Sequence, residues 1–176
     1  MSSATNDIAG NASEEVKDFL KHTVNIFTGQ RQKTFASSVL SRLILTEASL
    51  KNNAVEPQRK DSFIVYKITV DEDMINGGGN IHGGCSALLI DCCSSAAIIA
   101  MKLAQGAMSM DVSQSMNIIY HAPAAIGEVL RIVNTTMTMG KRITSARTEI
   151  WSETHHRLVA SGTHIKMEPS APTTKL

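Results

Sequence analysis

The chain has 176 residues, of which 43% are apolar and 19% are charged. This length fits one domain of the usual ~100 to 200 residues, and the composition is too apolar for a disordered chain. Seventeen Lys and Arg against sixteen Asp and Glu give a net charge of +1, which lacks the positive excess that binding to a nucleic acid backbone requires. We therefore expect a single folded domain that does not bind nucleic acid.

Both ends of the chain consist of small and polar residues, over 1–12 and over 169–176. We expect two flexible tails around one domain of residues 13–168. Three cysteines and the lack of an apolar N-terminal segment indicate a reducing compartment such as the cytoplasm. The final Thr174-Lys175-Leu176 differs by one side chain from the Ser-Lys-Leu signal, so a peroxisomal location is an alternative, as is a mitochondrial one.

A helix is expected at the start of the domain. Ser13 is followed by two glutamates, and apolar side chains then recur at helical spacing from Val16 to Phe27, before Gly29. A serine before the first turn, acidic residues within it and a glycine after the last turn are typical of helix ends. The pattern predicts an amphipathic helix that is capped by Ser13.

Six later segments are predicted to be strands, because they are rich in β-branched residues or alternate apolar with polar side chains. They cover residues 42–50, 62–70, 111–120, 129–139, 143–152 and 158–167. Turn residues separate the last three, at Gly140-Lys141 and at Thr154 to Arg157. These three strands are therefore expected to form an antiparallel meander.

The segment from Gly83 to Leu103 differs from the rest, because its small and aliphatic residues leave no polar face. A helix that is apolar all round is a buried helix, and its serines, paired glycines and central Asp91 argue against a membrane span. It lies between the second and third predicted strands. We expect an α+β fold in which an antiparallel sheet wraps this helix.

Common nucleotide-binding and hydrolase motifs are not found in the sequence. The glycines do not fit G-x-G-x-x-G, Gly140-Lys141 lacks the first glycine of a P-loop, and neither G-x-S-x-G nor H-E-x-x-H occurs. Cys85 and Cys92 could share a helix face near His82 and bind a metal or act as a nucleophile. The alternative is that they are small core residues, which is the usual place of free cysteine.

Asp91 is the only carboxylate between Asp73 and Asp111, and it lies in the middle of the helix predicted to be buried. Burial disfavours the charged form, so such a carboxylate needs hydrogen-bond donors or takes a raised pKa. Either state suits a general base or a nucleophile. The alternative is an Asp on a small exposed patch, or one that holds a loop by hydrogen bonds.

A glycine-rich loop, from Asn76 to Gly84, leads directly into the N-terminus of this helix. The first amides of a helix have no intrahelical acceptor, and the positive end of the helix dipole lies behind them. Such N–H groups can polarise a carbonyl and stabilise the oxyanion that forms when the carbonyl is attacked. Alternatively, the glycines serve only the dihedral angles of a turn.

Helix geometry limits how these two features can cooperate. Gly83 and Asp91 are eight positions apart, which is about 12 Å along a helix axis. One chain cannot bring both to the same carbonyl. A reaction that uses both needs a second subunit, most simply across a two-fold axis between antiparallel helices.

One combination of residues is characteristic of a known family. It consists of Asn76, then His82-Gly83-Gly84, then Asp91, and Ser113 ahead of the stretch from Asn117 to Pro123. With these residues the chain resembles the hotdog-fold acyl-CoA thioesterases, of the acyl-CoA thioesterase thirteen and bacterial phenylacetate-pathway types, over residues 33–167. The resemblance implies a long helix wrapped by an antiparallel six-stranded sheet, with homodimers that share one continuous sheet and usually pair into homotetramers.

The resemblance also implies roles for these residues. The position of Asp91 is the catalytic carboxylate of the family, acting on water or directly on the thioester carbonyl, and the Gly83 amide polarises that carbonyl. Asn76 and His82 come from the other subunit and position water and substrate. Ser113 helps to orient the water or the thioester.

A coenzyme A channel is implied as well. By resemblance it is lined by Gly84, Tyr120, His121, Pro123, Gly140, Lys141 and Arg142, with Lys166 reaching a phosphate. Taken alone, a basic pair in a turn is usually just solvated surface. The chain departs from the family pattern at Ser115 and in the long polar loop 52–60, which bears on acyl-chain preference and on the rim of the coenzyme site.

The leading hypothesis is hydrolysis of an acyl-CoA thioester to a free acid and CoA, without a metal or a redox cofactor, coenzyme A being part of the substrate. Two alternatives stay open: a non-catalytic acyl-CoA-binding protein on the same fold, and a hydratase or dehydratase of acyl thioesters. The sequence favours the hydrolase, because a binding protein has no need of a desolvated carboxylate beside a carbonyl site.

Overall fold

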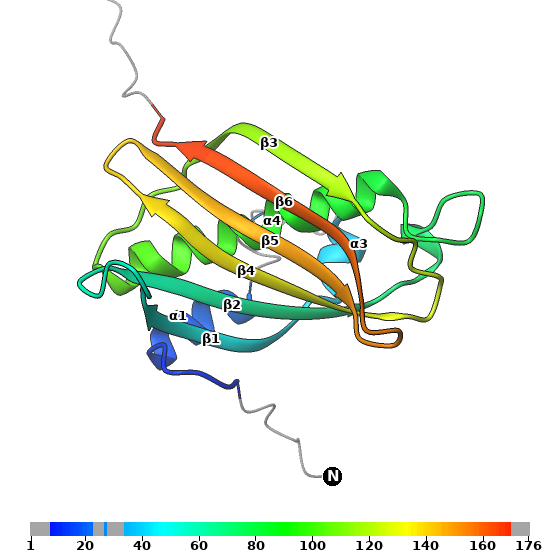
Figure 1. The fold of residues 1–176 in the computed structure, drawn as a ribbon, viewed down its shortest axis with the longest axis horizontal. Helices are drawn as coiled ribbons and strands as arrows, with labels where there is room; N and C mark the ends of the chain where they lie inside the picture. Colours follow the sequence, from blue (N-terminus) through cyan, green and yellow to red (C-terminus); the bar gives the residue numbers. More distant parts are fainter. Residues whose placement is uncertain (1–7, 23–26, 28–33, 170–176) are drawn as a thin grey trace, which may run out of the picture.

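The computed structural model describes residues 8–22, 27 and 34–169. In these residues an antiparallel six-stranded sheet curves around one long helix, α4 (Gly83–Ala104) (Figure 1). The strands are β1 (Ile44–Asn52), β2 (Lys60–Thr69), β3 (Val112–Tyr120), β4 (Val129–Met139), β5 (Ile143–Ser152) and β6 (Arg157–Met167). Their order is β1-β2-β4-β5-β6-β3, and β4 to β6 form the predicted meander. The α+β fold expected from the sequence is confirmed.

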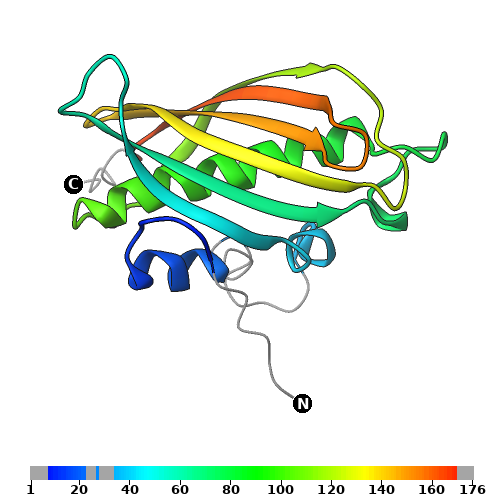
Figure 2. The same ribbon diagram turned by 60° about the horizontal axis from the view of Figure 1, so that its bottom comes forward.

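Helix α4 forms the centre of the core. It packs against β2, β4, β5 and β6, and α1 (Glu14–Lys21) contacts it from the side away from the sheet (Figure 2). Its length and composition alone would also suit a membrane span, but 67% of its most apolar stretch is buried inside the protein. Burial of this apolar surface is the main contribution to the stability of the fold.

Helix α1 begins as predicted. The Ser13 hydroxyl accepts a hydrogen bond from the Val16 N–H at 3.4 Å, and Glu14 and Glu15 occupy the first turn, where the helix dipole favours negative charge. The helix ends at Lys21. Phe27 is described as helical, while residues 23–26 and 28–29 of the expected continuation lie outside the described residues.

The N-terminal tail differs from the prediction where it is described. Residues 8–12 lie against the outer edge of β1: the Ala9 N–H donates to the Thr46 carbonyl and the Ala48 N–H donates to the Ala9 carbonyl. Gly10 is required there, because its φ is +100° and a Cβ would lie 2.2 Å from the Ala48 oxygen. Residues 1–7 and 170–176 of the expected tails, with Thr174-Lys175-Leu176, lie outside the described part of the chain.

The strand bounds agree with the sequence pattern to within two residues, and those of β4 and β5 agree fully. Strand β1 starts at Ile44 rather than at residue 42. The reason is that the Arg42 and Leu43 N–H groups close a turn after the four-residue helix α3 (Ser37–Leu40). Neither α3 nor the 3-10 helix η1 (Glu72–Met74) was expected, since both are too short to show a helical period.

The close approach of β6 to α4 leads to a stability prediction. A Cβ at Gly162 would lie 3.0 Å from Ile90 Cγ2 and 3.1 Å from the Asn117 carbonyl oxygen. We expect Gly162→Val to lower the free energy of unfolding by roughly 1 to 3 kcal/mol through overpacking. Urea denaturation measures this loss. The matched Gly77→Val, at an exposed position with no atom within 4 Å, should cost much less, and equal costs would contradict the packing argument.

Candidate active site

The loop before α4 is a closed turn held by Asn76. The Asn76 side-chain oxygen accepts hydrogen bonds from the Gly78 N–H at 2.9 Å and the Asn80 N–H at 3.3 Å. Gly79 has a φ of +75°, which favours glycine. Part of the glycine content therefore serves the turn, as the alternative interpretation held. The turn also fixes Asn76 beside the start of the helix.

His82 caps α4 in place of the usual serine or aspartate. Its Nδ1 accepts a hydrogen bond from the Gly84 N–H at 2.9 Å, so this nitrogen carries no proton. The ring thereby accepts a hydrogen bond from one of the amide N–H groups that have no acceptor within the first turn of the helix. The Gly83 N–H, one position earlier, meets no acceptor in the described residues, so it can donate to a ligand.

Several of the predicted site residues line one hollow of about 420 Å³ at this end of α4. Its walls are Asn76, Asn80, Ile81, Gly83, Ser86, Tyr120, His121, Ala122, Pro123 and Val159. The Tyr120 hydroxyl donates to the Gly83 carbonyl at 3.2 Å, and His121 Nε2 lies 2.9 Å from Ser161 Oγ. The structure thus brings the helix start and the Tyr120 to Pro123 stretch together. Asp91 does not line this hollow.

Asp91 lies two helical turns further along α4, with Ser113 of β3. The Ser113 hydroxyl donates to Asp91 Oδ1 at 3.4 Å, and a β-bulge at Gln114 accompanies the turn of Ser113 towards the helix. The Asp91 side chain is 44% exposed, so its predicted burial is wrong for the single chain. Because β3 is the last strand of the sheet, no further strand covers the carboxylate in the described residues.

His164 of β6 completes this group and was not found from the sequence. Its side chain is fully buried, with Nδ1 2.7 Å from Ser94 Oγ, Nε2 2.9 Å from Ser113 Oγ and Nε2 3.7 Å from Asp91 Oδ1. Burial lowers the pKa of His164, and the nearby Lys166 lowers it further, while Asp91 opposes both. The ring is therefore neutral at pH 7.

Lys166 of β6 is largely buried in the single chain. Only 8% exposed, it points from β6 into the core, and its Nζ donates to Ser95 Oγ of α4 at 2.7 Å. Burial lowers its pKa. Strand alternation gives Lys166 and His164 the same inward face. The contact with a coenzyme phosphate that the resemblance implies for Lys166 stays a prediction.

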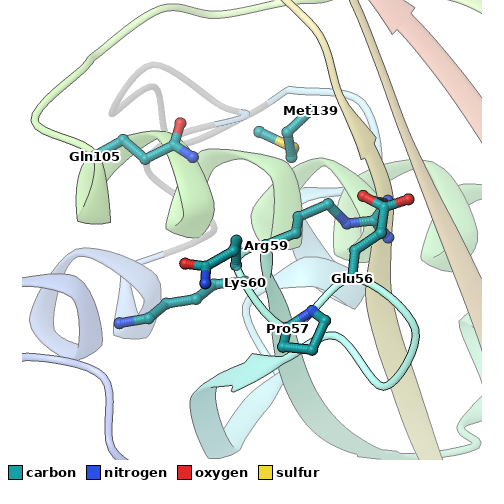
Figure 3. A pocket seen from close by; sticks show the side chains of 7 residues that line it. Glu56, Pro57, Arg59, Lys60, Gln105 and Met139 are labelled. Carbon is teal, nitrogen blue, oxygen red and sulfur yellow. Dashed lines mark ion pairs between the residues drawn. The ribbon is translucent and has the colours of Figure 1, made fainter.

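The turn of Gly140, Lys141 and Arg142 is exposed between β4 and β5 and lines none of the hollow at Gly83. A separate hollow of about 660 Å³ lies near it, at the C-terminal end of α4 (Figure 3). Its lining includes Gln105, Met139 and Arg59, and Arg59 pairs with Asp61 and Glu56. This hollow holds neither the free amide nor the Asp91 carboxylate, so it is not the candidate site.

Cys92 and Cys93 are buried and Cys85 is partly buried against the core, which is close to the alternative interpretation. Burial raises the pKa of Cys85 to about 11 and that of Cys92 to about 12, so few thiolates form at neutral pH and neither is a good nucleophile. In the described part of the chain, no three His, Cys, Asp or Glu side chains are grouped to hold a metal ion. His155 and His156 lie in the β5–β6 turn, as predicted.

Comparisons with known proteins identify the family and the fold of the chain. The model of the Thioesterase superfamily matches residues 78–159, a range that contains His82, Gly83, Asp91, Ser113 and the lining from Tyr120. Acyl-coenzyme A thioesterase 13 of Mus musculus is 32% identical over 103 residues, which make up 58% of this chain and 71% of the mouse protein.

Two solved structures share the fold. The crystal structure of zebrafish thioesterase superfamily member 2 superposes with a TM-score of 0.70 at 25% identity, covering 86% of this chain and 97% of that chain. The E. coli PaaI protein from the phenylacetic acid degradation operon gives a TM-score of 0.60 at 18% identity, over 86% of this chain and 97% of its own. The second likeness concerns the fold alone.

The buried neutral His164 predicts a pH dependence of stability. The unfolded chain binds a proton at this residue below pH ~6.5, while the folded chain resists it, so stability falls as the pH drops through that value. We expect wild type to lose more stability between pH 7.5 and 5.5 than His164→Gln does, as measured by thermal unfolding. His156→Asn, in the exposed turn, should keep the wild-type dependence. Equal losses in wild type and His164→Gln would contradict a buried neutral ring.

Proposed function

The chain belongs to the thioesterase superfamily and is a thioester hydrolase, and from this premise we propose that it hydrolyses acyl-CoA thioesters at a site shared by two subunits. The acyl-CoA substrate is supported by the related mouse protein, an acyl-coenzyme A thioesterase. The proposed mechanism rests on the pairing of two groups on α4: the Gly83 amide N–H, which has no acceptor in the described residues, and the Asp91 carboxylate, which accepts a hydrogen bond from Ser113. The products are a free acid and coenzyme A.

In the proposed reaction the thioester carbonyl accepts a hydrogen bond from the Gly83 N–H of one subunit. Negative charge grows on this oxygen during attack, and the start of the helix stabilises it. Asp91 of the second subunit either takes a proton from the attacking water or attacks the carbon itself. If Asp91 acts as the base, it passes the proton taken from water to the sulfur as the C–S bond breaks, which gives the free acid and the coenzyme A thiol. If Asp91 attacks the carbon, the C–S bond breaks to leave a mixed anhydride on Asp91 and a coenzyme A thiolate, which takes a proton from water, and a further water then hydrolyses the anhydride to the free acid. No metal or redox cofactor takes part in these steps.

Asn76 and His82 flank the same carbonyl, and Ser113 supports the carboxylate. We assign the Asn76 amide group and the His82 ring to positioning water and substrate, because both lie at the start of α4. Ser113 donates to Asp91 and is itself held by His164. This chain of hydrogen bonds keeps one carboxylate oxygen fixed and leaves the other free for the reaction.

The exposed edge of β3 supports a shared site. In the described residues β3 pairs with β6 alone, and its large side chains Met116, Ile119 and Tyr120 are 38%, 55% and 57% exposed. An apolar edge strand that is left open invites pairing with another strand. A two-fold axis between two β3 strands would extend the sheet and place the two α4 helices side by side.

The coenzyme A arm of the substrate can lie beside the thioester carbonyl, in the hollow at the start of α4. The hollow that contains Gly83 is walled by Tyr120, His121 and Pro123, which supports the channel that the resemblance implies. The β4–β5 turn, which contains Lys141 and Arg142, lies towards the C-terminal end of α4, away from the helix start that borders this hollow (Figure 1). We assign their contact with the coenzyme phosphates to the second subunit.

Replacement of Asp91 tests the chemistry. We expect Asp91→Asn to stay folded and to lower kcat by roughly 100-fold or more, because an amide can act neither as base nor as nucleophile. Release of free thiol from acyl-CoA measures kcat. Asp18→Asn, which changes an exposed carboxylate on α1, serves as the matched control and should keep full turnover. Near-normal kcat in Asp91→Asn would refute the mechanism.

Mixed dimers test the sharing of the site. A heterodimer of an Asn76→Ala chain and an Asp91→Asn chain contains one site with both residues intact and one with neither. At equal expression about half of the dimers are heterodimers, so activity should return to about a quarter of wild type. Each variant must be inactive alone, and mass spectrometry must detect the heterodimer. Heterodimers that stay at the single-variant level would show that the two residues do not act across an interface.

A further inference from the structure

Glu128 is a buried carboxylate that the proposed reaction does not use. It directly precedes β4, is 5% exposed, and does not line the hollow at the start of α4. Its Oε1 accepts hydrogen bonds from the Ala125 N–H at 2.9 Å and from Arg157 Nη2 at 3.1 Å, and its Oε2 accepts one from Ser152 Oγ at 2.6 Å. The carboxylate therefore joins the β3–β4 loop to the end of β5 and to the start of β6.

The surroundings of Glu128 keep it charged. Burial raises the pKa of this carboxyl, but the hydrogen bonds from Ser152 and from the Ala125 N–H, together with the positive charge of Arg157, bring the pKa below its ordinary value. Apolar residues often stabilise a buried position as well as an ion pair does. Stability alone therefore does not account for a carboxylate at this place.

The contact of Glu128 with the Ala125 N–H acts on a segment that pairs with the turn before α4. Residues 124–126 lie alongside residues 79–81 of that turn, through one β-bridge and two backbone hydrogen bonds. These are the Asn80–Ala125 bridge, the bond from the Ile81 N–H to the Ala124 carbonyl at 2.7 Å, and the bond from the Ile126 N–H to the Gly79 carbonyl at 3.1 Å. A shift of Ala125 would therefore move the turn that contains Asn76.

The chain on either side of this pairing forms the walls of the hollow. Asn76 and Gly83 lie on one wall, and the stretch from Tyr120 to Pro123, directly before Ala124, forms the other. Misplacement of a reacting group by about 1 Å can lower a rate roughly 100-fold. The register of the two walls thus bears on the distance between the Gly83 N–H and a bound carbonyl.

We propose that Glu128 is a positioning residue for the reaction, which holds the turn before α4 in register with the Tyr120 to Pro123 wall through the Ala125 N–H. The proposal rests on the thioesterase function proposed above. The Gly83 N–H of a subunit then depends on Glu128 of the same subunit, whereas its Asp91 does not. This difference separates a positioning role from a general role in stability.

Release of free thiol, from the best substrate of a series from acetyl-CoA to palmitoyl-CoA, tests the role of the carboxylate. Glu128→Ala removes the acceptor of the Ala125 N–H and should lower kcat by roughly tenfold or more, a larger change than that in KM. Glu128→Gln keeps an acceptor oxygen and should stay within about threefold of the wild-type kcat. Thr148→Val is the matched control, because it removes another buried hydrogen bond of β5, that to Asn134. It should keep kcat, and an equal loss of kcat in Thr148→Val would overturn the proposal.

Mixed dimers assign Glu128 to one half of the shared site. A dimer of a Glu128→Ala chain and an Asp91→Asn chain keeps one intact site, so co-expression should restore roughly a quarter of wild-type activity. A dimer of a Glu128→Ala chain and an Asn76→Ala chain keeps none, and co-expression should give less than about a tenth. If the Asn76→Ala and Asp91→Asn pair restores activity, any other pattern for Glu128→Ala overturns the proposal.

Hydrogen exchange followed by mass spectrometry separates this proposal from the proposed reaction. Glu128→Ala should speed exchange in residues 79–81 and 124–126 by roughly tenfold or more, whereas Glu128→Gln should not. If this occurs and wild type hydrolyses no acyl-CoA, Glu128 holds the walls and the proposed reaction is wrong. Unchanged exchange in Glu128→Ala, or faster exchange with the wild-type kcat, would show that Glu128 is not a positioning residue. Should Glu128→Ala fail to fold, Glu128→Asp, which is one methylene shorter, takes its place in each test.

Discussion

The fixed distance between Gly83 and Asp91 on one straight helix is the constraint on which the site depends. A helix cannot shorten by the about 12 Å that separates these positions, so the amide that can polarise a carbonyl and the carboxylate that can attack it belong to different reaction centres within one chain. In the dimer proposed above, the open edge of β3 and the Asp91 side chain, which is 44% exposed, would both be covered by the second copy of the chain.

Polar contacts inside the fold hold the strand that carries Ser113 against the helix that carries Asp91. Lys102, near the end of α4, forms an ion pair with Asp111, whose side chain is 1% exposed just before β3 begins. The Thr144 hydroxyl of β5 donates to the same carboxylate at 2.7 Å. Buried charges are tolerated when they are paired and hydrogen-bonded in this way. They keep α4 and β3 in register, which the short contact between Ser113 and Asp91 requires.

The sequence was sufficient for the parts of the fold that follow from local pattern, and insufficient where tertiary contacts decide. The apolar run after Gly83 and the alternation in β4 and β5 predicted their elements closely. The 44% exposure of the Asp91 side chain fits the alternative of an exposed carboxylate better than the burial expected from the helix as a whole. The inward face of β6 was not identified, because nothing local shows which face of this strand meets α4. Ala160 and Gly162 share that face with His164 and Lys166, and these small residues were the signal that could have identified it.

The dependence of activity on association tests the shared site most directly. Specific activity should be measured over a dilution series while analytical ultracentrifugation gives the fraction of dimer, with Ile119→Lys in β3 used to weaken the dimer if wild type does not dissociate. The account predicts that turnover per chain falls in parallel with the dimer fraction and returns when the protein is concentrated. Monomers that retain the full wild-type turnover per chain would contradict it.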